Sequence, residues 1–284
     1  MTSPETYIAF VLGGGGHLGA VEVGMLQALL DEDIRPDLVL GTSVGAINGC
    51  LVAQDPSPAA ARQLTELWQD IGRDDVFGRS VFGRISTLAR TGTALHSHDA
   101  LKKLLERTLS VQRIEDLAVA FQCVAASIER ASEHWFTSGP LIDAVLASAA
   151  VPGLLPPYEI DGEHFLDGGI VNSIPVGRAV DLGATDVYVL QVGRVERPLS
   201  PPTRPWEVGL VAFEIARRHR FAGDMAALPA GVTVHVMPGG DATPPRYNDL
   251  SNLKYRDFSQ VARRISSAYD ASRRYLADDI KKSP

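Results

Sequence analysis

Short apolar runs and segments of helical periodicity alternate from the start of the chain. The run YIAFVL (7–12) is continuous and ends in glycines, which is typical of a parallel strand buried on both faces. Residues 18–33 place apolar side chains three and four positions apart, so we expect a helix there. DLVLGTS (37–43) and SVGAINGCLVAQ (43–54) predict a second strand and a second helix. This β-α-β-α order predicts an α/β fold, with a mostly parallel central sheet and helices on both faces.

The same alternation continues to the end of the chain. Further strands are expected at 118–128, 184–193 and 231–239, and further helices at 61–71, 98–109 and 140–152. The proline-rich stretch 196–206 predicts a connector. Residues 257–280 carry apolar residues at helical spacing and predict a C-terminal amphipathic helix. Because the strands are spread from start to end, we expect a single domain over residues 1–284.

Composition narrows the class of protein. Hydrophobic residues make up 45% of the chain and charged residues 21%, as in ordinary globular proteins. The net charge of −7 argues against nucleic acid as a partner. Cys50 and Cys123 form no C-x-x-C pair, so neither a disulfide framework nor a metal site is expected. The N-terminus has no basic region and no stretch reaches the ~20 apolar residues of a spanning helix, which predicts a cytoplasmic location.

The glycines after the first strand form a loop that can hold an anion. Gly14, Gly16 and Gly19 give the pattern G-x-G-x-x-G (Gly14–Gly19), which suits the pyrophosphate of a dinucleotide or the oxyanion of a tetrahedral intermediate. A dinucleotide fold needs an acidic residue at the carboxyl end of the second strand, where this chain has G-T-S (41–43). No Lys-Ser or Lys-Thr pair follows the glycines. The placement of residues therefore disfavours a nucleotide.

A G-x-S-x-G sequence stands at the end of the second predicted strand. This sequence is GTSVG (Gly41–Gly45), and a predicted helix follows it. The arrangement is typical of a nucleophile elbow, in which Ser43 sits on a sharp turn before a helix N-terminus. The alternative is a glycine-rich turn with a serine helix cap. Adjacent parallel strands would bring Ser43 and the glycine loop to one edge of the sheet, which favours acyl transfer.

A nucleophilic serine needs a base, and the histidines offer no clear one. His219 falls on a predicted helix face and His235 in a predicted strand. A more distinctive stretch is FLDGGIVNSIP, in which Asp167 precedes two glycines (Asp167–Gly169). A carboxylate at this position can project into a tight site, although the stretch taken alone is more typical of a simple turn.

The glycine loop, the G-x-S-x-G sequence and the D-G-G sequence occur in an order that resembles the patatin-like phospholipases. The resemblance runs from Tyr7 to Leu190 and includes the segment AAVPGLLPP. It implies a patatin-like fold and a serine hydrolase that cleaves acyl esters of lipids through an acyl-enzyme, without a cofactor or metal. It also implies a Ser-Asp catalytic dyad, with Ser43 as the nucleophile and Asp167 as the proton acceptor. The implied oxyanion donors are the backbone N–H groups of Gly14, Gly15 and Gly16.

The chain departs from the family at one position of the glycine loop. The family usually has Arg or Lys immediately before the last glycine, whereas this chain has Leu18. The missing charge keeps two alternatives open. In the first, the same dyad acts on a thioester or a short-chain ester. In the second, the protein is a weakly active or non-catalytic regulator that binds a lipid or a protein partner.

A basic and apolar segment is a candidate contact with a membrane surface. Residues 76–92 carry apolar residues at helical spacing together with Arg79, Arg84 and Arg90 and no acidic residue. In an acidic chain, such a segment suits a transient contact with lipid, which would place the protein at the periphery of the membrane. The alternative is a helix that covers the sheet and holds its arginines in water.

Overall fold

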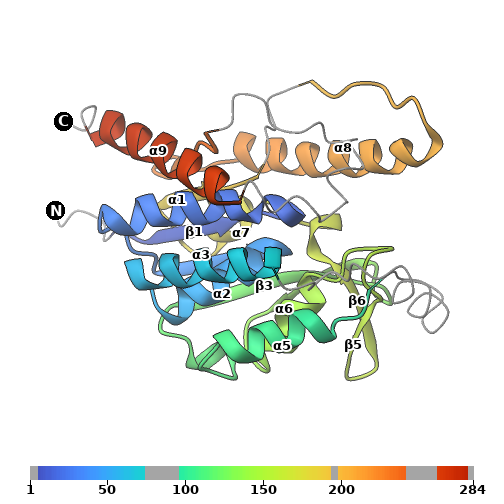
Figure 1. Ribbon diagram of the computed structural model, residues 1–284. Coiled ribbons are helices and arrows are strands. Elements are labelled where there is room, and N and C mark those ends of the chain that lie inside the picture. The colour runs from blue at the N-terminus through green and yellow to red at the C-terminus, as the bar shows by residue number, and fades with distance from the viewer. Residues whose placement is uncertain (1–5, 74–95, 193–197, 241–260, 281–284) are drawn as a thin grey trace.

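A computed structural model describes residues 6–73, 96–192, 198–240 and 261–280 of the chain. Its centre is a sheet of eight strands in the order β5-β6-β3-β2-β1-β7-β8, with β4 also paired to β3 (Figure 1). The parallel strands are β1 (Ile8–Leu12), β2 (Leu38–Thr42), β3 (Ala120–Ser127), β7 (Asp186–Leu190) and β8 (Thr233–Val236). Each of them lies within a predicted strand, and the predicted α/β class is confirmed.

Three antiparallel strands at one side of the sheet escaped prediction. They are β4 (Ser132–Phe136), β5 (Tyr158–Ile160) and β6 (Glu163–Asp167). These strands are short and most of their residues are only partly buried or exposed. Because little of their surface enters the core, they lack the continuous apolar runs that identify the parallel strands.

Helices cover both faces of the sheet, and each face is a hydrophobic core. The side chains of β1 alternate between these two cores. Phe10 and Leu12 enter the larger core, and Ala9 and Val11 enter the smaller one. The larger core is covered by α1 (Ala20–Asp31), α2 (Val44–Gln54), α3 (Pro58–Arg73), α5 (Asp99–Thr108), α6 (Leu141–Ser148) and α9 (Val261–Ile280). The smaller core is covered by α7 (Val176–Asp181) and α8 (Pro205–Ala226). Both faces are therefore buried, as predicted for the sheet.

The structure differs from the prediction at the ends of some helices and in helices α7 and α8. The helix expected from residue 18 begins as a 3₁₀ turn, η1 (Gly16–Gly19), and the one expected at 140–152 ends at Ser148. Helix α7 was not predicted, and of α8 only the helix face around His219 was predicted. Helix α8 begins inside the predicted proline-rich connector. This is possible because Pro205 lies in the first turn of the helix, where backbone N–H groups make no intrahelical hydrogen bond. The candidate membrane segment 76–92 lies outside the described residues.

The C-terminal amphipathic helix is part of the core. Val261, Ile265, Ala268 and Leu276 lie along one side of α9 and are buried in the larger core. Helix α9 packs along α1, and Figure 1 shows the first and last helices of the chain side by side. Residues 257–260 of the predicted helix lie outside the described part. None of the described helices is long and apolar enough to cross a membrane.

We predict that Gly24→Ala destabilises the protein by about 1–3 kcal/mol, because it over-packs the contact between α1 and α9. An added Cβ at Gly24 would lie 2.2 Å from the backbone oxygen of Ile265 and 2.8 Å from the backbone nitrogen of Tyr269. Urea denaturation measures the change in the free energy of unfolding. Gly223→Ala is the control, because its Cβ would meet nothing within 4 Å. Equal stability of Gly24→Ala and the unmodified protein would contradict this packing.

Candidate active site

Ser43 occupies a strained turn between β2 and α2. Its backbone has φ 56° and ψ −122°, a combination that side-chain-bearing residues rarely adopt. The glycines on either side make the turn possible. An added Cβ at Gly41 would lie 2.5 Å from the Cα of Ala46, and one at Gly45 would lie 2.2 Å from the backbone oxygen of Leu12. The G-x-S-x-G spacing is therefore required by the close approach of α2 to both strands.

Hydrogen bonds attach this turn to segments that are distant in sequence. The N–H of Ser43 donates to Oγ of Ser148 on α6, at 3.0 Å. The hydroxyl of Thr42 donates to the backbone oxygen of Asn172, at 2.9 Å. Ser43 itself is only 5% exposed. The turn is thus held from two sides, and its hydroxyl lies in a nearly closed environment.

Asp167 is the last residue of β6 and is brought to the same edge of the sheet. Strand β6 pairs with β3, which pairs with β2, and the N–H of Asp167 donates to the backbone oxygen of Ala150 at 2.9 Å. The N–H of Gly169 donates to Oδ1 of Asp167 at 2.7 Å and fixes the carboxylate. A Cβ at Gly168 would lie 2.1 Å from the backbone oxygen of Val124. The D-G-G sequence is therefore also required by close backbone packing.

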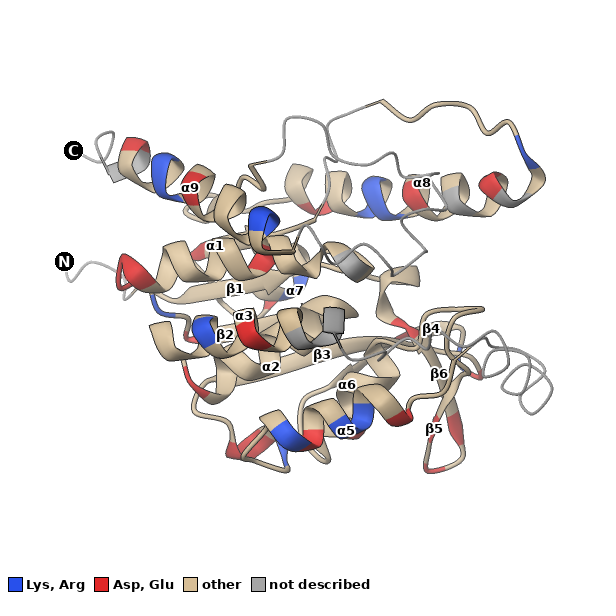
Figure 2. Ribbon diagram, viewed as in Figure 1, with Lys and Arg blue, Asp and Glu red and all other residues tan. Residues whose placement is uncertain are grey.

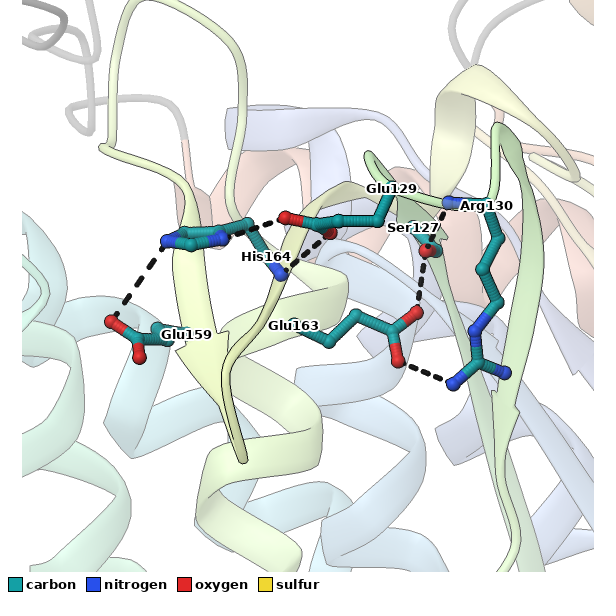
Figure 3. Close-up of polar contacts among 6 residues, drawn as sticks. All are labelled: Ser127, Glu129, Arg130, Glu159, Glu163 and His164. Carbon is teal, nitrogen blue, oxygen red and sulfur yellow. Dashed lines mark hydrogen bonds and ion pairs between the residues drawn. The ribbon is translucent and has the colours of Figure 1, made fainter.

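The opposite end of β6 is fastened at the protein surface by a polar cluster (Figure 3). Glu163 contacts Arg130 and accepts a hydrogen bond from the hydroxyl of Ser127. Glu129 accepts from the backbone N–H of His164 at 2.9 Å and lies 2.8 Å from Nδ1 of its ring. These hydrogen bonds from His164 lower the pKa of Glu129. The cluster joins β6 to the turn between β3 and β4, so both ends of the strand that carries Asp167 are fixed.

Burial raises the pKa of Asp167 to about 6, and the hydroxyl of Ser43 and the N–H of Gly169 lower it by smaller amounts. The structure thus brings the hydroxyl of Ser43 close enough to Asp167 to act on its pKa. Within the described residues, the buried Oδ2 of Asp167 makes no hydrogen bond of standard geometry. A carboxylate with this pKa is ionised at neutral pH and is a stronger base than an exposed one.

The glycine loop lies directly against Ser43. An added Cβ at Gly14 would lie 3.4 Å from the Cβ of Ser43. The N–H of Gly14 donates to the backbone oxygen of Ser173 at 3.0 Å, so this group is engaged and the prediction of Gly14 as an oxyanion donor needs correction. Within the described residues, the N–H groups of Gly15 and Gly16 donate to no acceptor. These two remain the candidate oxyanion donors.

A buried polar network that the sequence analysis missed holds the end of this loop. Nδ2 of Asn48 donates to the backbone oxygen of Gly19 at 3.0 Å and to Oε2 of Glu22 at 2.8 Å. Nε1 of Trp68 donates to Oδ1 of Asn48 at 3.0 Å. Burial raises the pKa of Glu22 well above its ordinary value, while hydrogen bonds from Asn48 and the backbone of Gly13 lower it. The available signal was an acidic residue between apolar neighbours, in AVEVGM.

Three of the described histidines have polar partners other than Ser43 and Asp167. His98, His164 and His235 make their polar contacts elsewhere, with Pro156, Glu129 and Tyr275 respectively. The described residues contain no group of three His, Cys, Asp or Glu that could hold a metal ion. Cys50 and Cys123 are buried free thiols. Leu18 is partly buried against the larger core, so an apolar contact occupies the position of the family's usual cation.

The sequence is similar to known proteins of one family. The sequence profile of the patatin-like phospholipases matches residues 10–180. A patatin-like phospholipase domain-containing protein of Caenorhabditis elegans, ZK370.4, is 35% identical over 191 residues, which are 66% of this chain and 14% of that protein. Lysophospholipase nte1 of Aspergillus terreus is 29% identical over 197 residues, which are 66% of this chain and 12% of that protein.

A solved structure is also similar. The crystal structure of VipD from Legionella pneumophila aligns with a TM-score of 0.49 and 14% identity, over 97% of this chain and 67% of that one. The match to the relatives from C. elegans and A. terreus spans no more than 14% of their length. The family profile, by contrast, matches more than half of this chain and includes all the motifs described above. The chain belongs to the patatin-like phospholipase family.

Proposed function

We propose that this protein is a serine hydrolase that cleaves acyl esters of lipids, with Ser43 as the nucleophile and Asp167 as the base. One observation carries the proposal. The hydroxyl of Ser43, on a strained turn, contacts a buried carboxylate whose pKa is raised to about 6. The family supports a lipid ester as substrate, and one relative is named a lysophospholipase.

In the proposed reaction, Ser43 Oγ attacks the ester carbonyl while Asp167 takes the hydroxyl proton. The N–H groups of Gly15 and Gly16 hold the negative oxygen of the tetrahedral intermediate, and the N-terminus of α2 adds its positive dipole end. When the intermediate collapses, the leaving alcohol takes the proton from Asp167 and an acyl-enzyme remains. Water, deprotonated by Asp167, attacks this ester, and the second collapse releases the acid and returns the proton to Ser43.

Burial and hydrogen bonding act on Asp167 in opposite directions. Burial raises the basicity of the carboxylate, and the hydrogen bonds from Ser43 and Gly169 limit the rise of its pKa to about 6, so that the group is still ionised at neutral pH. The Gly169 N–H bond at 2.7 Å holds Oδ1, while Oδ2 has no partner and is free to accept the serine proton. The carboxylate is thus oriented by one oxygen and reactive through the other.

Ser43→Ala should lower hydrolysis of a p-nitrophenyl ester by about 10³-fold or more, because it removes the atom that forms the acyl-enzyme. A fluorophosphonate probe should label the unmodified protein at Ser43, as read by peptide mass spectrometry. Ser132→Ala, which changes an exposed serine on β4, is the control and should behave like the unmodified protein. Turnover that Ser43→Ala leaves unchanged would mean that Ser43 is not the nucleophile, whereas neither turnover nor labelling in the unmodified protein would favour the non-catalytic alternative.

The same assay distinguishes the acyl-ester alternatives. A series of p-nitrophenyl esters of increasing chain length, an acyl thioester and lysophosphatidylcholine are compared at equal enzyme concentration. A lipid hydrolase should prefer the long-chain esters and release fatty acid from lysophosphatidylcholine. A preference for the thioester or for the shortest ester would reject the lipid substrate while leaving the dyad in place.

The pH dependence should follow Asp167. Because the base must be deprotonated, kcat/KM for a neutral, water-soluble ester should rise with pH through about 6 and be lost as the pH falls below that value. Asp167→Asn should abolish the rise along with most of the activity. An acid limb near pH 4 in the unmodified protein would mean that Asp167 is not the base, or that its pKa is not raised.

Protein stability gives an independent reading of the same pKa. Between the ordinary pKa of 3.8 and the folded value of about 6, the folded state binds more protons than the unfolded state, so stability falls as the pH rises through this window. The Asp167→Asn variant has no carboxyl at this position, so it does not lose this stability as the pH rises. Its free energy of unfolding, relative to the unmodified protein, should therefore increase by up to about 3 kcal/mol between pH 4 and pH 7.

Gly15→Ala should lower kcat by about 10²-fold or more with a small change in KM, because it displaces an oxyanion donor. The added Cβ would lie 1.5 Å from Cγ2 of Val192 and 2.9 Å from its Cβ, so the loop has to move. Gly15→Ala combined with Val192→Ala removes the nearer clash and should recover part of kcat. A fully active Gly15→Ala variant, or no recovery in the double variant, would contradict this role for the loop.

A further inference from the structure

Exposed large hydrophobic side chains are concentrated at one place on the described surface. Five such residues are exposed in total, and Ile128 stands apart on the turn between β3 and β4. Val208, Phe213 and Ile215 lie on the first half of α8, with exposures of 55%, 39% and 55%. Ile170, at 40%, lies on η3 (Gly168–Ile170), which packs against α8. We call these four residues, together with Ala212, the α8 apolar surface.

The acidic residues Glu207 and Glu214 of this part of α8 both have polar partners. Glu214 bonds Arg217 at 2.9 Å and Arg218 at 3.1 Å. Glu207 is buried and accepts from the backbone N–H of Thr203 at 2.7 Å. Figure 2 shows charged positions at intervals along α8 and not as one continuous face. Val208, Ala212 and Ile215 recur three and four residues apart, so they share one exposed side of the helix.

The α8 apolar surface adjoins the proposed active site. Cζ of Phe213 lies 3.2 Å from the position of an added Cβ on Gly169, and the N–H of Gly169 holds the carboxylate of Asp167. In Figure 1 the beginning of α8 lies at the same end of the molecule as β6, whose last residue is Asp167. A molecule that covers this surface therefore sits at the edge of the site.

The other side of α8 fixes the helix to the protein. Val211 and Phe221 are buried, and Phe221 enters the smaller core. Near the end of the helix, Asp224 accepts from the backbone N–H of Gly177 at 3.1 Å. The exposed apolar residues are consequently held on a firmly attached helix, and they are not needed for its packing.

We propose that the α8 apolar surface docks the protein on an uncharged lipid surface, such as a layer of zwitterionic phospholipid. The proposal rests on the lipid hydrolase function proposed above. Burying these side chains in lipid removes apolar area from water, and their fixed position brings the site to the interface. The net charge of −7 disfavours an anionic membrane. A second copy of the chain is a poorer occupant, because it would cover the approach to Asp167.

The test uses the full chain with Ser43→Ala, so that lipid is bound and not consumed. Co-sedimentation with phosphatidylcholine vesicles is compared for Ser43→Ala alone and for Ser43→Ala with Val208→Asp and Ile215→Asp. The control adds Ile128→Asp, which places the same charge at a residue that is 46% exposed and lies outside the surface. Phe213 is left unchanged because it contacts the site. We expect the Val208/Ile215 variant to bind vesicles at least tenfold more weakly and the Ile128 variant to bind normally.

Hydrolysis separates docking from catalysis. With Ser43 intact, Val208→Asp/Ile215→Asp should hydrolyse a water-soluble short ester within twofold of the unmodified rate, but release fatty acid from vesicle lipid at least tenfold more slowly. The proposal is overturned if Val208→Asp/Ile215→Asp in the Ser43→Ala background binds vesicles normally. It is also overturned if Ser43→Ala alone does not bind vesicles. A dimer, seen by sedimentation velocity, that the two aspartates dissociate overturns it as well. Short-ester hydrolysis that survives Ser43→Ala would instead reject the proposed function.

Discussion

The close approach of α2 to the end of β1 is the constraint on which the site depends. At Gly45, a side chain would collide with the backbone oxygen of Leu12 at 2.2 Å, and at Gly41 it would collide with α2 itself. With glycine at both positions, the turn that carries Ser43 lies beside the glycine loop that leaves β1. The positive φ of Ser43 is the conformational consequence, and packing on all sides maintains it. Ser43 and the glycine loop are thus positioned by one contact between backbones.

Helix α2 also connects this contact to the loop through a side chain. Asn48 lies one turn beyond the Ser43 turn and binds the carbonyl of Gly19, where the loop ends. The side-chain amide of Asn48 also donates to Glu22 on α1 and accepts from Trp68 on α3. Because all three side chains are buried, loss of one partner leaves the others unsatisfied in an apolar environment. The loop therefore keeps its shape through a network that spans three helices, although its own glycines have little conformational preference.

Local patterns predicted the parallel strands and the motifs that follow them, because continuous apolar runs and paired glycines report burial and close approach directly. The hairpin of β5 and β6 has no such signal, and Asp167 was assigned through the family resemblance and not through its own sequence context. The engagement of Gly14 by Ser173 could not be predicted either, since that hydrogen bond joins segments that meet only after the sheet has formed. The first half of helix α8 was missed because its exposed side carries Val208, Phe213 and Ile215, so it lacks the polar face by which surface helices are recognised.

The glycine loop carries no Lys or Arg that could act on the charge of Asp167. Leu18 packs against the core, so the position before the last glycine of the loop contributes no formal charge. A nearby cation would hold the pKa of a buried carboxylate low and weaken it as a base. With apolar packing at Leu18, desolvation acts on Asp167 with only the Ser43 and Gly169 hydrogen bonds opposing it, and the pKa settles near 6. Apolar packing at Leu18 is therefore consistent with a buried carboxylate whose pKa is raised by desolvation.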